Sequence, residues 1–138
     1  MGILQELDVG MIAAPMAGGA STPELAAAVG AAGGLGFVAA GYLPAEAMGE
    51  RVRRLRALTD RPFGVNVFVP DRDTADPKAL AAYRERLEPE AARLGVEPGA
   101  AVWSDDDYPA KLAALRADPV PLVSFTFGCP APGDTAAL

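Results

Sequence analysis

The residues best suited to chemistry are polar side chains that stand where a buried strand should be apolar. In the run 63–69, the two-residue period of a strand sets valines on one face and Asn66 on the other. A second apolar run, 122–127, places Ser124 and Thr126 together on one face. A buried amide or hydroxyl costs free energy unless it is hydrogen-bonded. These groups therefore either bind a ligand or bond each other, and the pattern leaves both interpretations open.

The opposite face of each run is apolar and is expected to pack against helices. It carries Val65, Val67 and Val69 in the first run, and Val123, Phe125 and Phe127 in the second. The polar faces would then point away from the helices, near the carboxyl ends of the strands. In α/β barrels this is the end at which ligands bind.

A third candidate is the segment Ala14-Pro15-Met16-Ala17, which two glycines follow. Small residues let a flat ligand approach the backbone closely, and Pro15 fixes the direction of the chain. The polarizable thioether of Met16 suits contact with a ring system. The alternative interpretation is a tight strand-to-helix turn in which Met16 only fills space.

No residue of the chain is assigned a catalytic role. The sequence contains no histidine, the usual acid or base near neutral pH. Cys129 has no neighbour in the sequence that marks it as a nucleophile. The acidic run 105–107 is better explained as the negative first turn of a helix than as a metal site.

Strand and helix signals alternate along the chain, and they define the elements that must position these residues. Strands are predicted at 11–17, 35–40, 63–69 and 122–127. Helices are predicted to begin at Ser21, Pro44, Asp76-Pro77 and Ser104, and the third is predicted to break at Pro89. Ser21 is expected to cap the first helix in a capping box with Glu24, and Ser104 to cap the last with Asp107 three residues later.

This alternation is typical of a parallel sheet covered by helices. The loop after the first predicted strand lacks the spaced glycines of a dinucleotide-binding fingerprint, which disfavours an open doubly wound sheet. An eight-stranded barrel needs about 250 residues. We therefore expect residues 1–138 to form one partial domain, the N-terminal half of a (β/α)8 TIM barrel with about four β/α units.

Composition narrows the classes of partner. The net charge of −6 disfavours nucleic acid, because phosphate binding needs clustered Lys and Arg. No apolar run is long enough to span a bilayer, so no membrane partner is expected. The single cysteine fits a reducing compartment, and the first residues show no secretion signal. A cytoplasmic protein is expected.

Four segments resemble the nitronate monooxygenases, also known as 2-nitropropane dioxygenases. They occur in the family's order and lie at 14–25 (Ala-Pro-Met-Ala-Gly-Gly-Ala-Ser-Thr-Pro-Glu-Leu), 32–37, 62–68 (Pro-Phe-Gly-Val-Asn-Val-Phe) and 123–130 (Val-Ser-Phe-Thr-Phe-Gly-Cys-Pro). The resemblance implies a barrel that binds FMN non-covalently and oxidises alkyl nitronates with molecular oxygen.

The resemblance also assigns roles to residues of this sequence. It implies that Asn66 contacts the flavin and that the turn of Ala14, Pro15, Met16 and Ala17 lies against the isoalloxazine ring. Ser124, on the same polar face as Asn66, completes the expected cofactor-binding set.

The chain also departs from the family pattern. In the family, a Gly-Gly-His segment in the later half supplies the catalytic base, and glycine-rich loops there hold the FMN phosphate. Neither is present in this sequence. We therefore expect a truncated product or one piece of a split protein.

Two other functions remain open. The first is an FMN-dependent enoyl-acyl carrier protein reductase, for which we expect Gly-Gly-Met where this chain has Ala14-Pro15-Met16. The second is a non-catalytic half barrel that pairs with a separate C-terminal half, or with itself through open sheet edges.

Overall fold

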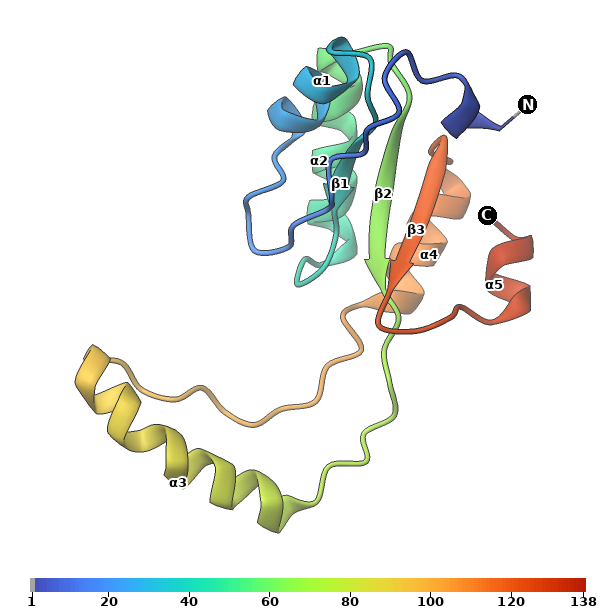
Figure 1. Cartoon of the computed structure of the whole chain (residues 1–138). Helices are drawn as coiled ribbons and strands as arrows, with labels where there is room; N and C mark the ends of the chain where they lie inside the picture. The colour runs from blue at the N-terminus through green and yellow to red at the C-terminus, as the bar shows by residue number, and fades with distance from the viewer. Residues whose placement is uncertain (1) are drawn as a thin grey trace. The chain divides into compact units, whose positions relative to one another are not determined.

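A parallel sheet of three strands lies at the centre of the computed structural model, which describes residues 2–138. Strands β1 (Gly36–Ala39), β2 (Phe63–Phe68) and β3 (Leu122–Thr126) lie side by side in that order (Figure 1). Each is joined to the next through a helical segment, as parallel neighbours require. This confirms the predicted α/β half barrel with a parallel sheet.

Three helices cover one face of the sheet: α1 (Pro23–Ala31), α2 (Ala45–Leu58) and α4 (Tyr108–Ala117). Their buried side chains form one core with the sheet valines, as predicted for Val65 and Val67. Burying such a side chain fully is worth about 1.5–3 kcal/mol. The core residues are Ala26, Val38, Ala40, Met48, Val52, Leu55, Phe63, Val65, Val67, Tyr108, Leu112 and Leu115.

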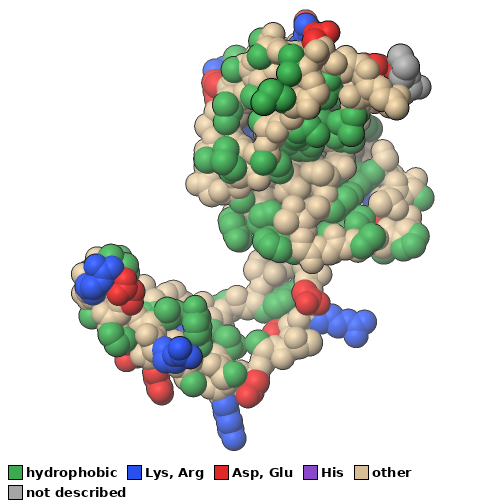
Figure 2. All heavy atoms as spheres, viewed as in Figure 1, with side chains coloured by type: hydrophobic (Ala, Val, Ile, Leu, Met, Phe, Trp, Pro, Cys, Tyr) green, Lys and Arg blue, Asp and Glu red, His purple; other side chains and the backbone are tan. Residues whose placement is uncertain are grey.

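The chain divides into two compact units. One comprises Met1–Pro70 and Asp105–Leu138, and it also holds a 3-10 helix (Ile3–Gln5) and α5 (Pro132–Ala136). The other, Asp71–Ser104, consists of α3 (Pro77–Leu94) and its flanking segments, and it carries both acidic and basic side chains on its surface (Figure 2). No helix within residues 2–138 combines the length and apolarity needed to cross a membrane.

The predicted break at Pro89 is wrong, because α3 continues through it from Pro77 to Leu94. Proline removes one N–H from the helix and leaves the carbonyl four residues earlier without its partner. That residue, Glu85, is exposed, so water can hydrate its carbonyl.

The first predicted strand, 11–17, is much shorter than expected. Only Ile12 forms a parallel bridge, to Leu35, and the backbone hydrogen bonds there involve Met11 and Ala13. Pairing stops early because Pro15 has no N–H to give to a neighbouring strand, and because a side chain takes the N–H of Met16.

That side chain is Ser21, which the sequence suggested as a helix cap. The Ser21 hydroxyl accepts a hydrogen bond from Met16 N at 2.8 Å and lies 3.5 Å from the Ala14 carbonyl oxygen. The helix cap is instead Thr22, whose Oγ1 accepts from Leu25 N at 3.2 Å. Ser21 therefore anchors the turn, and the predicted capping box is wrong.

Replacing Ser21 with alanine should loosen this turn. Ser21 is buried (4% exposed) and its hydroxyl contacts both Met16 N and the Ala14 carbonyl oxygen, so the variant would lose both contacts. We expect Ser21→Ala to lower the free energy of unfolding by about 1–3 kcal/mol. Urea denaturation measures this change. A loss no larger than about 0.3 kcal/mol would contradict the anchoring role.

The predicted cap of α4 is also wrong. The helix begins at Tyr108, and its N-cap is Asp107 in the left-handed conformation (φ 55°), not Ser104. The carboxylates of Asp106 and Asp107 are therefore not the first turn of α4. They reach across to the loop that follows β1, as described below.

Candidate functional site

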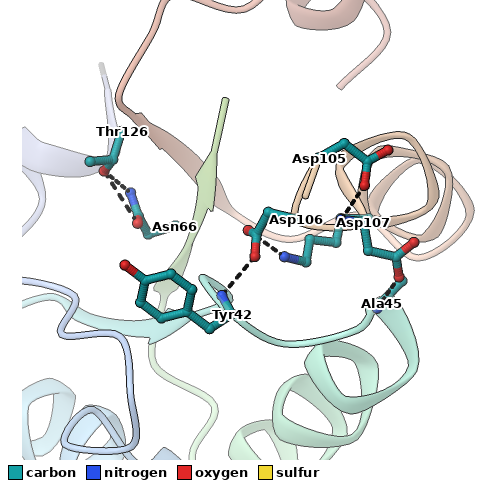
Figure 3. A network of polar contacts seen from close by, with 8 residues as sticks. Tyr42, Ala45, Asn66, Asp105, Asp106, Asp107 and Thr126 are labelled. Atoms are coloured by element: carbon teal, nitrogen blue, oxygen red, sulfur yellow. Dashed lines mark hydrogen bonds and ion pairs between the residues drawn. The ribbon is translucent and has the colours of Figure 1, made fainter. Parts of the chain in front are cut away.

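The structure brings Asn66, Ser124 and Thr126 together on the sheet face that points away from the helices. Strand register sets Asn66 directly opposite Ser124. Asn66 Nδ2 donates to Ser124 Oγ at 2.9 Å. It also donates to Thr126 Oγ1 at 3.0 Å, and the Thr126 hydroxyl donates to Asn66 Oδ1 at 3.3 Å (Figure 3). Asn66 is 3% exposed. The polar residues thus form hydrogen bonds with each other, which was one of the two interpretations that the sequence left open.

These contacts leave hydrogen-bonding capacity in the polar cluster of Asn66, Ser124 and Thr126. A carboxamide offers two N–H donors and two acceptor positions. The contacts use both donors of Asn66 and one acceptor position of its Oδ1. The Ser124 hydroxyl accepts here and keeps its own O–H for another partner. The cluster therefore presents one acceptor beside one donor, the complement of a heterocycle edge that carries a carbonyl and an N–H.

An aromatic row of Tyr42, Phe68 and Phe127 stands at the carboxyl ends of the strands, one ring from each strand end. The Tyr42 and Phe68 rings meet edge to face with centroids 5.3 Å apart, and those of Phe68 and Phe127 with centroids 4.7 Å apart. Aromatic pairs favour this geometry. Tyr42 and Phe127 are exposed, so an apolar surface borders the end of the sheet where barrel ligands bind.

The prediction that Phe127 packs on the helix face is wrong. Phe127 follows the last residue of β3 and adopts a left-handed backbone (φ 71°). This conformation ends the strand alternation and turns the ring toward Phe68, leaving Phe127 75% exposed. Phe125, one alternation earlier, packs against the core as predicted.

Two carboxylates hold the loop that carries Tyr42. Asp106 Oδ1 accepts from Tyr42 N at 2.7 Å, and Asp107 Oδ2 accepts from Ala45 N, the first residue of α2, also at 2.7 Å (Figure 3). The Nζ of Lys111 lies 2.6 Å from the other oxygen of Asp106. The Lys111 side chain is fully buried, so water does not solvate its ammonium group. The carboxylate of Asp106 balances that charge instead.

The turn of Ala14, Pro15, Met16 and Ala17 is positioned by Ser21 rather than by the polar cluster. Met16 is 46% exposed, and its neighbours are exposed or half-buried. Within residues 2–138, no hydrogen bond links this turn to Asn66. The structure therefore bonds Asn66 to Ser124, whereas the turn is held by Ser21.

Elsewhere, Tyr108 at the start of α4 donates its phenol proton to Asp134 Oδ2 at 3.3 Å. Burial, together with the Asp134 carboxylate, raises the pKa of Tyr108 above its ordinary value. Cys129 is exposed, and residues 2–138 hold no group of three or more side chains suited to binding a metal.

The raised pKa predicts a pH dependence. Below about pH 10, the pKa of free tyrosine, the phenol is protonated in both states, so its contribution to stability is complete. Above that value the unfolded chain ionises first, and stability falls with rising pH. In Tyr108→Phe this component should be absent. Urea midpoints of wild type and Tyr108→Phe are measured between about pH 9 and about pH 11. If the two midpoints change with pH in parallel, the raised pKa of Tyr108 is contradicted.

The comparisons with known proteins assign the family. The family model for nitronate monooxygenase matches residues 5–138. This chain belongs to the nitronate monooxygenase family. Members of this family are flavoproteins that act on small molecules.

Individual relatives agree with this assignment. The chain is 39% identical to the nitronate monooxygenase of Paraburkholderia phytofirmans and 40% identical to that of Pseudomonas aeruginosa. The matches cover 96% and 93% of this chain, respectively. In both cases the chain spans 37% of the length of the relative.

Solved structures extend the comparison to the fold. The nitroalkane oxidase from Streptomyces ansochromogenes is 49% identical, with a TM-score of 0.90 over 99% of this chain and 39% of that one. FabK from Thermotoga maritima is a more distant neighbour at 26% identity, with a TM-score of 0.56 over 89% of this chain and 28% of that one.

Sequence reasoning missed Tyr42, Asp106, Asp107 and Lys111. For Asp106 and Lys111 a signal was available, because the lysine follows the aspartate at a five-residue spacing and lies among apolar helix positions. The link to Tyr42 had no local signal, since 64 residues separate it from Asp106.

Proposed function

We propose that this chain forms the cofactor-facing part of an FMN-dependent nitronate monooxygenase, which oxidises alkyl nitronates with molecular oxygen. The observation that carries the proposal is the buried Asn66, hydrogen-bonded to the half-buried Ser124 and Thr126, on the helix-free face of the sheet. A polar cluster in that position is unusual for a sheet that only packs. In a chain of this family, a flavin is the ligand that explains it.

The residues present suit a flavin. The unused acceptor of Asn66 Oδ1 and the O–H of Ser124 match a ring edge that carries both an N–H and a carbonyl. Ala14, Pro15, Met16 and Ala17 would offer a small, apolar surface to the flat ring. FMN held by these residues would supply the two-electron redox chemistry between the nitronate and oxygen. The chain's own residues bind and orient the ring, and none is assigned as the base.

The domain and its setting follow as part of this proposal. Residues 1–138 would be one partial TIM-barrel domain, completed by further β/α units whose next strand pairs with the open edge of β3. The protein would act in the cytoplasm on a small nitronate and oxygen. On its own, the chain would associate with a second copy through the unpaired edges of its sheet.

A chimera tests the function. This chain replaces the matching segment of the Streptomyces ansochromogenes nitroalkane oxidase, for which a TM-score of 0.90 makes the exchange feasible. Oxygen uptake is followed with an alkyl nitronate and with its parent nitroalkane, each with and without NADPH. The unaltered Streptomyces protein is the positive control.

We expect oxygen uptake with the nitronate that does not depend on NADPH. NADPH-dependent reduction of an enoyl thioester without nitronate turnover would instead favour the enoyl reductase. A folded chimera that binds flavin but turns over neither substrate would contradict both enzymes and favour the non-catalytic half barrel.

A further inference from the structure

The backbone at Tyr42 is held in a conformation that tyrosine rarely adopts. Its φ is 63°, in the left-handed region, and among non-glycine residues only Asp106, Asp107 and Phe127 also have positive φ within residues 2–138. Bulky side chains disfavour this region, so the surrounding contacts must stabilise it. Such residues cluster at functional sites.

The contacts that stabilise Tyr42 come from the start of α4. Asp106 accepts the hydrogen bond from Tyr42 N at 2.7 Å, and its second oxygen lies 2.6 Å from the buried Lys111 Nζ. Asp107 binds Ala45 N at 2.7 Å and so caps α2 from another part of the chain. Both ends of the loop 42–45 are therefore fixed by neighbouring carboxylates.

Lys111 makes the Asp106 carboxylate a rigid acceptor. The lysine side chain is 0% exposed and the Asp106 side chain is 14% exposed. A buried ammonium needs a charged partner, so Asp106 cannot swing away without leaving Lys111 unpaired. The carboxylate is thus held in the orientation that also meets the Tyr42 N–H.

The ring of Tyr42 is the part of this arrangement that reaches the candidate site. It is 74% exposed and packs edge to face on Phe68, whose ring in turn meets Phe127. Figure 3 shows the ring extending from the loop on the side of Asn66 and Thr126, while its backbone N–H faces Asp106. Fixing the backbone of Tyr42 therefore also fixes one end of the aromatic row.

We propose that Asp106, held by Lys111, is a positioning residue that keeps Tyr42 and the aromatic row in place as the wall that receives the alkyl part of the substrate. This rests on the proposed function. The three rings carry no charge and present apolar surface beside the polar cluster, which suits a hydrocarbon chain attached to a polar reacting group. Each methylene buried there would strengthen binding about fourfold.

The first test examines the positioning of Tyr42 in the chain itself, without flavin or substrate. The proton shift and hydrogen exchange of the Tyr42 amide are measured by NMR in wild type, Asp106→Ala and Asp106→Asn. Glu24→Gln is the control, since it weakens an exposed ion pair with Arg54 that includes no residue of this loop.

In Asp106→Ala we expect the Tyr42 amide to move upfield and to exchange at least tenfold faster, with the rest of the spectrum still dispersed. Asp106→Asn keeps an oxygen acceptor, and combined with Lys111→Met, so that no buried ammonium is left without a charged partner, it should recover most of the protection. An unchanged Tyr42 amide in Asp106→Ala would overturn the positioning role. If Asp106→Ala unfolds the chain, Lys111→Met is compared with wild type instead: faster exchange of the Tyr42 amide supports the holding of Asp106 by Lys111, and unchanged exchange overturns it.

The second test examines the alkyl wall in the chimera. KM is measured for linear nitronates of increasing length in wild type, Tyr42→Ala and Asp106→Ala. We expect KM to rise about tenfold for the longest nitronate and little for the shortest, with kcat within about twofold. Equal effects at all lengths would overturn the alkyl wall. A chimera without any nitronate turnover would overturn the proposed function and the alkyl wall with it, whereas the Tyr42 amide decides the positioning role separately.

Discussion

Replacing Gly36 with alanine should destabilise the chain by about 3 kcal/mol, because β1 and α1 are in backbone contact there. A Cβ on Gly36 would lie 2.4 Å from the carbonyl oxygen of Ala26 and 2.5 Å from its Cα. Both atoms belong to the backbone of α1, so a side-chain rotation cannot relieve the overlap. Helix and strand would have to separate, and the core around Val38 would open with them.

Urea denaturation of Gly36→Ala measures this effect, and Gly49→Ala is the matched control. Gly49 lies within α2, and its added Cβ would meet only the flexible guanidinium end of Arg53, at 3.4 Å. In a helix interior, glycine to alanine stabilises by about 0.5–1 kcal/mol. The two variants should therefore shift the urea midpoint in opposite directions. Equal shifts would contradict the close packing of α1 on β1.

Replacing Asn66 with leucine should weaken flavin binding in the chimera by about tenfold or more. Leucine has a similar size but can neither donate nor accept, so the flavin loses its proposed acceptor. The hydroxyls of Ser124 and Thr126 also lose their shared partner. One lost hydrogen bond of about 1.4 kcal/mol corresponds to a tenfold change in the dissociation constant. Flavin fluorescence titration of the apoprotein measures this affinity.

Val52→Ala is the control that separates binding from stability. Val52 is a core residue of α2 on the opposite side of the sheet from Asn66, and its truncation costs about 2 kcal/mol. We expect this variant to retain wild-type flavin affinity at temperatures where it is folded. If Val52→Ala and Asn66→Leu weaken flavin equally, the loss reflects stability, and the role of Asn66 is contradicted.

The sequence predicted best those features that depend on local pattern. The alternation around Asn66 and Ser124 placed both side chains on the face away from the helices. It succeeded because the two-residue period of a strand decides on which face of the sheet each side chain lies. The same pattern failed at Phe127, where a left-handed residue ends the alternation. A period cannot reveal the residue at which the strand stops.

The features that the sequence did not predict depend on contacts between distant segments. Ser21 had the residue type of a helix cap, but its hydroxyl turns back to Met16 and the cap falls to Thr22. Asp106 and Asp107 had the pattern of a helix start, yet their partners lie 64 and 62 residues away. Nothing local distinguishes an aspartate that caps its own helix from one that caps another.

The central claim is that this chain supplies the flavin-facing part of a nitronate-oxidising enzyme. Its most direct test is the anaerobic mixing of the flavin-loaded chimera with an alkyl nitronate, while the absorbance of the oxidised flavin is recorded. We expect the nitronate alone to remove this absorbance and the admission of oxygen to restore it. A flavin that stays oxidised with every nitronate but is reduced by NADPH would contradict a nitronate-oxidising enzyme.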